Sequence, residues 1–316
     1  MKSLLLFLLT LCIGSSCHQP DSASGQATNP PDSLVWPGYS INSLKTDTTL
    51  FAQPEQVGKL ADGDLSESSG IAASPQNPGY FWTQEDSGNP NEIQLINQEG
   101  DVVGAYTLAG LTNRDWEEIT VGPGPIPGKR YVYVAEIGDN QLRYSTKIIY
   151  RFLEPTLDTT RLPVRETITA IDSIKLTLPD GPKNAEAILL DPGTLDLYLL
   201  SKEAYCVLYK ASYPQSLTQT TMMEKLLVTP LDYLTAAAMS PDGKEMLIRT
   251  YDQLFYFTRQ PGESVVDALK RPPLLLPLAQ EAQGEAIGWA ANGAGYYTTS
   301  ERTFFFAEPL YFYLRN

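Results

Sequence analysis

The sequence predicts an all-β protein, a five-bladed β-propeller, because strand-like runs alternate with turns and one short motif recurs. No stretch has sustained helical periodicity, and Tyr, Val, Ile, Thr and Phe concentrate in short runs that are typical of strands. A triplet returns about every 50 residues, with one longer interval of about 70. The triplets are Ser69-Gly70-Ile71, Glu117-Glu118-Ile119, Glu186-Ala187-Ile188, Ala237-Ala238-Met239 and Glu285-Ala286-Ile287.

Each triplet opens the same series of elements, which defines one blade. An apolar strand follows it, then a turn rich in Pro, Gly and Asn, and then a second strand of apolar and aromatic residues. A third strand comes next, and a fourth strand follows in all blades but the last. Four antiparallel strands per repeat of this length are typical of a propeller blade. We therefore expect five blades, which start near residues 69, 117, 186, 237 and 285.

Two segments do not fit the simple repeat. The last blade ends at Asn316 after its third strand, whereas residues 46–60 precede the first blade and have no blade of their own. We expect that segment to supply the missing outer strand of the last blade and to close the ring, which removes unpaired edges. The second unit has about 20 extra residues, which we expect to form a long loop around residues 154–166.

The N-terminus has the features of an export signal. Residues 1–16 begin with a lysine, continue as an apolar run and end in small residues, as signal peptides do. Cys17 is then the expected lipidation site, and residues 17–35 have the composition of a flexible tether. Residues 36–316 are expected to form a single propeller domain. We expect a location in the bacterial cell envelope, with a lipid anchor in the membrane; plain secretion is the alternative.

Composition excludes several kinds of chemistry. His18 is the only histidine and lies in the tether, so the domain has no histidine for a catalytic triad or a metal. Cys206 is the only cysteine after Cys17, and we expect it to be buried in a strand. The formal net charge of −14 disfavours nucleic acid as a partner. A bound metal would have oxygen ligands, which favours a hard cation such as Ca²⁺.

The first residue of each triplet is expected to point toward the propeller axis, because the first strand of each blade lines the central channel. Three of these residues are glutamates, whose carboxylates would repel one another unless a cation lies between them. Hydration or hydrogen bonds to backbone amides are the alternative. Glu118, by contrast, is expected to point between blades or to the surface. The expected Ca²⁺ ligands are Ser69, Glu117, Glu186 and Glu285.

Charged residues also follow the second strand of each blade, where they are expected to share one rim of the propeller. Glu85 or Glu136 would act there as a general base. Lys202 and Arg249 would neutralise the charge that develops on a phosphoryl group. Ion pairs between ordinary loop residues would explain the same charges without a catalytic function. The Asp, Gly and Asn residues that follow Glu85 and Glu136 equally suit tight turns.

Three segments of the first two blades carry a resemblance to known proteins. The runs SGIAASPQNPGYFWTQEDSGN, RDWEEI and YVYVAEIGDN resemble a group of secreted bacterial propeller proteins known mainly as uncharacterised sequences. This resemblance covers the first two blades well and the rest loosely. It implies the fold and export, and little about chemistry.

A second resemblance concerns the axial residues. The order Ser, Glu, Glu, Ala, Glu is similar to the order Ser, Glu, Glu, Ser, Glu in the five-bladed soluble calcium-activated nucleotidases, the apyrases. In that family a central Ca²⁺ lies in the channel and nucleotide phosphates bind nearby. The similarity implies that Ser69, Glu117, Glu186 and Glu285 are calcium ligands. Ala237 departs from the pattern, and the nucleotide-binding segments of that family are not recognisable here.

Three functions are compatible with these features, and the sequence does not decide whether the protein is an enzyme. The first is a binding module, a lipid-anchored propeller with a central cation that binds an unknown small molecule or protein. The second is a Ca²⁺-dependent hydrolase of phosphate esters or nucleotides. The third is glycoside hydrolysis, which needs two carboxylates at a separation that a sequence cannot supply.

Overall fold

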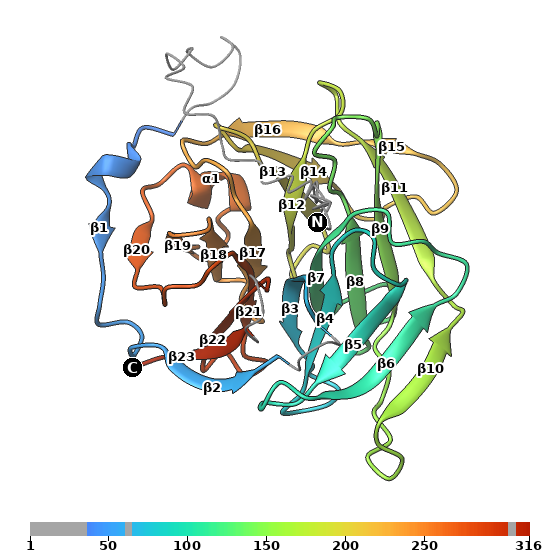
Figure 1. The fold of residues 1–316 in the computed structure, drawn as a ribbon. Coiled ribbons are helices and arrows are strands. Elements are labelled where there is room, and N and C mark those ends of the chain that lie inside the picture. Colours follow the sequence, from blue (N-terminus) through green and yellow to red (C-terminus); the bar gives the residue numbers. More distant parts are fainter. Residues whose placement is uncertain (1–36, 61–64, 303–307) are drawn as a thin grey trace, which may run out of the picture. The chain divides into compact units, whose positions relative to one another are not determined.

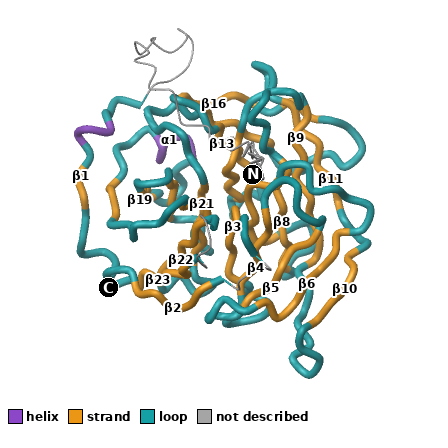
Figure 2. Tube along the Cα trace, viewed as in Figure 1, coloured by secondary structure: helices purple, strands orange, loops and turns teal. Residues whose placement is uncertain are grey.

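The structure is a computed structural model and describes residues 37–60, 65–302 and 308–316, which belong to one compact unit. The expected signal peptide, Cys17 and the tether lie outside the described residues. The described chain is almost entirely strand and loop, with five sheets arranged in a ring (Figures 1 and 2). The predicted five-bladed β-propeller is therefore confirmed.

Five inner strands surround the central channel (Figure 1). Each inner strand contacts the inner strand of the next blade, and the last contacts the first. All five recurring triplets lie in these strands, so the alignment of the repeats matches the blades. The inner strands are β3 (Ser68–Ala73), β7 (Trp116–Pro123), β12 (Ala185–Leu190), β17 (Ala236–Met239) and β21 (Gly284–Trp289).

The other strands complete each sheet outward from its inner strand. Blade one adds β4 (Phe81–Glu85), β5 (Glu92–Ile96), β6 (Val102–Leu108) and β10 (Val164–Ile168). Blade two adds β8 (Arg130–Glu136), β9 (Thr146–Leu153), β11 (Asp172–Thr177) and β15 (Thr221–Met222). Blade three adds β13 (Leu197–Ser201), β14 (Val207–Ala211) and β16 (Glu224–Val228). Blade four adds β18 (Glu245–Arg249), β19 (Leu254–Thr258), β20 (Leu274–Leu276) and β1 (Lys45–Thr46). Blade five adds β22 (Gly295–Ser300), β23 (Pro309–Leu314) and β2 (Glu55–Lys59).

Two short helices accompany the described strands. The 3₁₀ helix η1 (Ile41–Ser43) precedes β1, and the helix α1 (Val265–Leu269) lies between β19 and β20. The side chain of Ser264 caps α1 by accepting a hydrogen bond from the Asp267 amide. No helix in the described parts of the chain is long and apolar enough to cross a bilayer.

The segment that precedes the first blade joins the last one. Strand β2 pairs antiparallel with β23 and is the outermost strand of blade five. The Lys59 amide then donates to the Glu99 carbonyl of blade one at 2.9 Å. Contacts of β21 with β3 also join these two blades, so the role of β2 in closing the ring stays a prediction.

The long loop expected around residues 154–166 is partly a strand. Its last residues open β10, which pairs parallel with β6 at the outer edge of blade one. Strands β1 and β15 add to the edges of their sheets in the same parallel manner. The added strands cover edges that would otherwise present unpaired backbone groups. Local sequence patterns do not reveal such pairings, because each partner lies in another part of the chain.

Apolar side chains fill the spaces between neighbouring blades. Between blades one and two, the rings of Trp82 and Tyr106 meet edge to face with their centroids 5.1 Å apart. Between blades three and four, Cys206 is fully buried one residue before β14, close to the strand position expected for it. This packing holds the five inner strands in place around the channel.

Candidate functional site

Four of the five inner strands have a β-bulge near their first residue. These bulges turn side chains toward the end of the channel at which the inner strands begin. In blade two, Trp116 pairs with Glu136 and Glu118 pairs with Ala135, so Glu117 is the extra residue between them. A bulge turns the side chain of its extra residue away from the regular alternation. Ala237 of blade four has no carboxylate. It pairs regularly with Ile248, so its strand has no bulge at this position. The four extra residues are the four expected metal ligands, Ser69, Glu117, Glu186 and Glu285.

Lys202 lies between two of these glutamates. Its ammonium is 2.5 Å from Glu186 Oε2 and 4.0 Å from Glu285 Oε1, and it donates to the Tyr251 hydroxyl at 2.8 Å. Burial lowers the pKa of Lys202, but the two carboxylates outweigh burial and hold its pKa above the usual value. Burial raises the pKa of Glu186 to about 8 although Lys202 opposes the shift. The protein thus supplies its own cation at this part of the axis.

Ser69 belongs to a separate hydrogen-bonded group that includes Glu301. Ser69 Oγ donates to Glu301 Oε1 at 3.3 Å. Gln283 Nε2 donates to Glu301 Oε2 at 2.5 Å and to Glu285 Oε1 at 3.4 Å. Burial and the nearby Glu285 raise the pKa of Glu301 to about 10. Glu301 is therefore joined to the axial residues Ser69 and Glu285 by hydrogen bonds.

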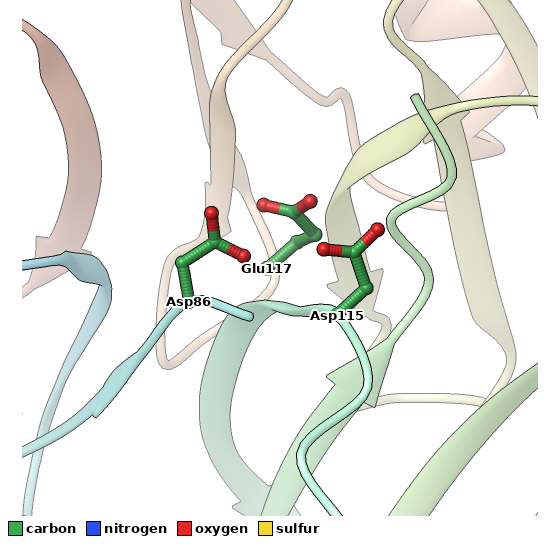
Figure 3. Close-up of side chains that lie close together, drawn as sticks. All are labelled: Asp86, Asp115 and Glu117. Carbon is green, nitrogen blue, oxygen red and sulfur yellow. The ribbon is translucent and has the colours of Figure 1, made fainter. Parts of the chain in front are cut away.

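Glu117 faces Asp86 and Asp115, and these three residues form the acidic triad (Figure 3). One oxygen from each of the three carboxylates lies within 4.8 Å of the other two. Asp86 follows β4 and Asp115 precedes β7, so the antiparallel order of the strands brings both to the start of the inner strands. Asp86 was expected on the rim after the second strand, in a run that equally suits a tight turn, whereas Asp115 was not singled out from the sequence.

Glu117 has no hydrogen-bond donor among the described residues, although only 4% of its surface is exposed. Burial, together with the charges of Glu186, Asp86 and Asp115, raises the pKa of Glu117 well above its usual value. Burial likewise raises the pKa of Asp86 to about 7. Such a buried carboxylate is costly unless it takes up a proton or faces a cation.

Gly138 makes the close approach of the triad possible. An ideal Cβ at this position would overlap the Glu117 carboxylate and the Asp115 carboxyl group. The Gly138 amide also donates to the Asp115 carbonyl at 3.2 Å and holds the two loops together. A glycine two residues after the end of β8 was the local signal of this arrangement, but a turn explains the same residue.

The acidic triad has the donor set of a hard-cation site. It offers carboxylate oxygens only, from residues that converge on one point (Figure 3). Ca²⁺ takes six to eight oxygen ligands, so water and carbonyl groups would have to complete the set. The triad contains one of the four expected ligands, Glu117, and replaces the others with Asp86 and Asp115.

Glu85 and Glu136, the two residues expected to act as a general base, both have structural partners. Glu85 accepts hydrogen bonds from the amides of Ser66 and Glu67 at 2.9 and 3.4 Å. Glu136 accepts from Trp116 Nε1 at 3.2 Å and from the Tyr150 hydroxyl at 3.0 Å. Both carboxylates are buried and fix the loops and rings around them.

Arg249 also has a structural environment. Its side chain is fully buried and forms a 2.7 Å ion pair with Glu281, which is fully buried too. Its other nitrogens donate to the carbonyls of Thr250 and Ala286. Because its side chain is fully buried and paired with Glu281, Arg249 is not exposed to a phosphoryl group on the rim. Of the four residues expected to be catalytic, Lys202 alone contacts the axial glutamates.

Glu118 was expected to point between blades or to the surface, and the structure shows the first of these alternatives. Glu118 is buried, and its Oε2 accepts a hydrogen bond from the Ala237 amide of blade four at 3.1 Å. Its Oε1 accepts from the Ile119 amide at 3.1 Å. The intervening inner strand of blade three has Ala187 at the corresponding position, which leaves space for the longer side chain. Glu118 thus links two blades that are not neighbours.

Comparison with known proteins supports no closer assignment than the fold. No family model matches the chain, and no curated protein matches it. Fold and site together define a class, a five-bladed β-propeller with carboxylates gathered at one end of its channel.

Proposed function

We propose that this protein is a binding module whose acidic triad holds a hard divalent cation, with Ca²⁺ the first candidate. The observation that supports the proposal best is Glu117, a buried carboxylate without a hydrogen-bond donor that faces two further carboxylates. A cation would remove the repulsion among the three groups and replace the water that burial has taken from Glu117. Through the cation, the rim would bind an unknown small molecule or protein.

Charge favours binding over hydrolysis of phosphate esters. The triad, Glu186 and Glu285 contribute five carboxylates, and the cations near them are already paired: Lys202 with Glu186 and Glu285, Lys147 with Asp139 and Arg114 with Glu136. An anionic substrate would approach this excess of carboxylates with little compensating charge. The Ca²⁺-dependent hydrolase remains the second candidate, because Lys202 lies beside the acids where a phosphoryl oxygen would bind.

We further propose that the protein is attached to the bacterial cell envelope by a lipid on Cys17. The support is the order of residues in the N-terminal sequence, a basic start, an apolar run and small residues before the cysteine. Replacing Cys17 with Ala should move the protein from the membrane fraction to the soluble fraction. Retention in the membrane fraction would contradict lipid anchoring.

Titration calorimetry with CaCl₂, after dialysis against EDTA, tests the cation site. The native protein should bind one Ca²⁺ and melt at a higher temperature when it is bound. Glu117→Gln should abolish both effects, because it removes the charge while it keeps the shape. Glu99→Gln changes an exposed glutamate and serves as the matched control. Absence of any calcium effect on the native protein would refute the proposal.

Phosphate release separates the two candidate functions. A binding module should release no phosphate from nucleotides or phenyl phosphate in the presence of calcium. Turnover that Lys202→Ala abolishes would instead support the hydrolase. Turnover that survives Lys202→Ala would point to a contaminating enzyme and leave the binding module in place.

A further inference from the structure

A small cavity lies at the opposite end of the channel from the acidic triad. Its volume is about 80 Å³, and residues from all five inner strands line it. The acidic residues lie at the starts of these strands, whereas the cavity residues lie in their middle and last parts, apart from Ala237 near the start of β17. The cavity is therefore a separate site on the same axis.

Small side chains leave this end of the channel hollow. Seven lining positions carry Ala or Gly, namely Ala72, Ala73, Gly122, Ala237, Ala238, Gly288 and Ala291. Two of the glycines also let neighbouring strands approach each other. A Cβ at Gly122 would lie 2.5 Å from Leu190 Cδ2, and one at Gly288 would overlap the Ile71 carbonyl. The space is thus a result of residue choice on the inner strands.

The walls of the cavity combine apolar and polar surface in nearly equal parts, with one charged residue among those that line it. Ile119, Leu190 and Trp289 contribute large apolar surfaces, whereas Arg130 contributes a guanidinium at the exposed rim. The indole nitrogen of Trp289 already donates to the Ala238 carbonyl at 3.2 Å.

Arg130 has a free guanidinium as far as the described residues show. It forms no ion pair or side-chain hydrogen bond with them, and its charge acts weakly on the buried carboxyl of Glu154. That carboxyl already accepts hydrogen bonds from Ser74 and from Trp82. Arg130 can therefore donate to a ligand without breaking an existing contact, and guanidinium groups suit carboxylates.

We infer that this cavity binds a small monocarboxylate with an apolar body. The body fills the space between the inner strands, and the carboxylate accepts hydrogen bonds from Arg130 at the rim. The cavity volume corresponds to roughly five to eight water-sized groups. A short-chain or single-ring carboxylate has this size. The inference is independent of the proposed cation site, because neither Arg130 nor the cavity wall contacts the acidic triad.

Three probes with the same ring separate charge from shape in a titration followed by calorimetry and saturation-transfer NMR. Benzoate should bind saturably to the full chain, benzyl alcohol about tenfold more weakly, and benzylamine more weakly still. The measurements are made in EDTA and repeated in CaCl₂, and both should give the same affinities. Equal binding of all three probes, or no saturation by benzoate, would overturn the inference.

Two variants assign the binding to the cavity. Arg130→Gln should lower the affinity for benzoate about tenfold and leave benzyl alcohol unchanged. Lys129→Gln, at the neighbouring exposed residue outside the cavity, should change neither. Ala73→Leu fills the cavity from a half-buried position and should abolish binding of both probes. If the Ala73→Leu variant does not fold, Thr120→Phe serves as the cavity-filling change in its place. Benzoate binding that survives Arg130→Gln and both cavity-filling changes would contradict the assignment.

Discussion

The two ends of the channel are built from the same five strands and have opposite chemistry. At the starts of the strands, bulges turn Glu117, Glu186 and Glu285 inward, and loop residues add further carboxylates. Toward their ends, the strands present alanine, glycine and aliphatic residues to a nearly uncharged cavity. One extra residue in each of four inner strands, together with acids from the adjoining loops, thus gives the two ends of a repeated scaffold different chemistry.

Glu118 lies between these two ends and helps to keep them apart. Its carboxylate crosses from blade two to the Ala237 amide of blade four. Burial raises the pKa of Glu118 well above its usual value, although the two backbone amides oppose the shift.

The largest effect is expected from filling the space inside the acidic triad. Gly138→Ala would place a methyl group where the Glu117 and Asp115 carboxyl groups now lie. Calcium affinity, measured by calorimetry, should fall by about 10- to 100-fold or more. Gly38→Ala, at a glycine with open space around it, is the control. Unchanged calcium binding in Gly138→Ala would show that the cation does not bind at the triad.

Removal of the internal cation should have the next largest effect. Lys202→Met leaves Glu186 and Glu285 without the ammonium between them. We expect the calcium-free protein to lose about 1–3 kcal/mol of stability in urea denaturation, and calcium to bind about tenfold more tightly. Lys183→Met, which breaks a partly exposed ion pair with Glu203, is the matched control. Weaker calcium binding in Lys202→Met would mean that Lys202 supports the cation instead of competing with it.

The stability of the calcium-free protein should fall as pH rises from about 5 to about 8. Burial raises the pKa of Asp86 to about 7 and that of Glu186 to about 8, whereas both lose their protons near pH 4 when unfolded. Between these values the folded state binds more protons, so the free energy of unfolding decreases with pH.

Calcium should oppose this loss of stability, because a bound cation replaces the protons that the carboxylates would otherwise hold. The difference in melting temperature between CaCl₂ and EDTA should therefore increase from pH 5 to pH 8. Differential scanning calorimetry measures both curves. A difference that stays constant over this range would contradict the described burial of these carboxylates.

The smallest effect is expected at the apolar end. Trp289→Phe removes the hydrogen bond from the indole to the Ala238 carbonyl and should cost about 1 kcal/mol in urea denaturation. Since no titrating carboxylate lines this end, the loss should be the same at pH 5 and pH 8 and with or without calcium. A loss that depends on calcium would mean that the two ends are coupled.

Much of the architecture could be predicted because blades repeat locally. Turns, strand composition and the spacing of the triplets identified five blades and the inner strand of each. The equivalence of Ser69, Glu117, Glu186 and Glu285 followed from the same repeat, and the shared bulges bear it out. The edge strand β10 could not be predicted, because in the chain it follows β9 of blade two, whereas its partner β6 belongs to blade one.

The sequence by itself determined the fold class, the absence of histidine chemistry from the domain and the gathering of acids near the axis. The tertiary structure alone decided which acids meet: Asp86 and Asp115 join Glu117, while Lys202 separates Glu186 from Glu285. It also decided that Arg249 is buried in an ion pair and that Glu118 crosses the channel. The physical reason is that the repeat specifies the backbone position of each residue within its blade. The groups that a side chain contacts, in contrast, come from other parts of the chain.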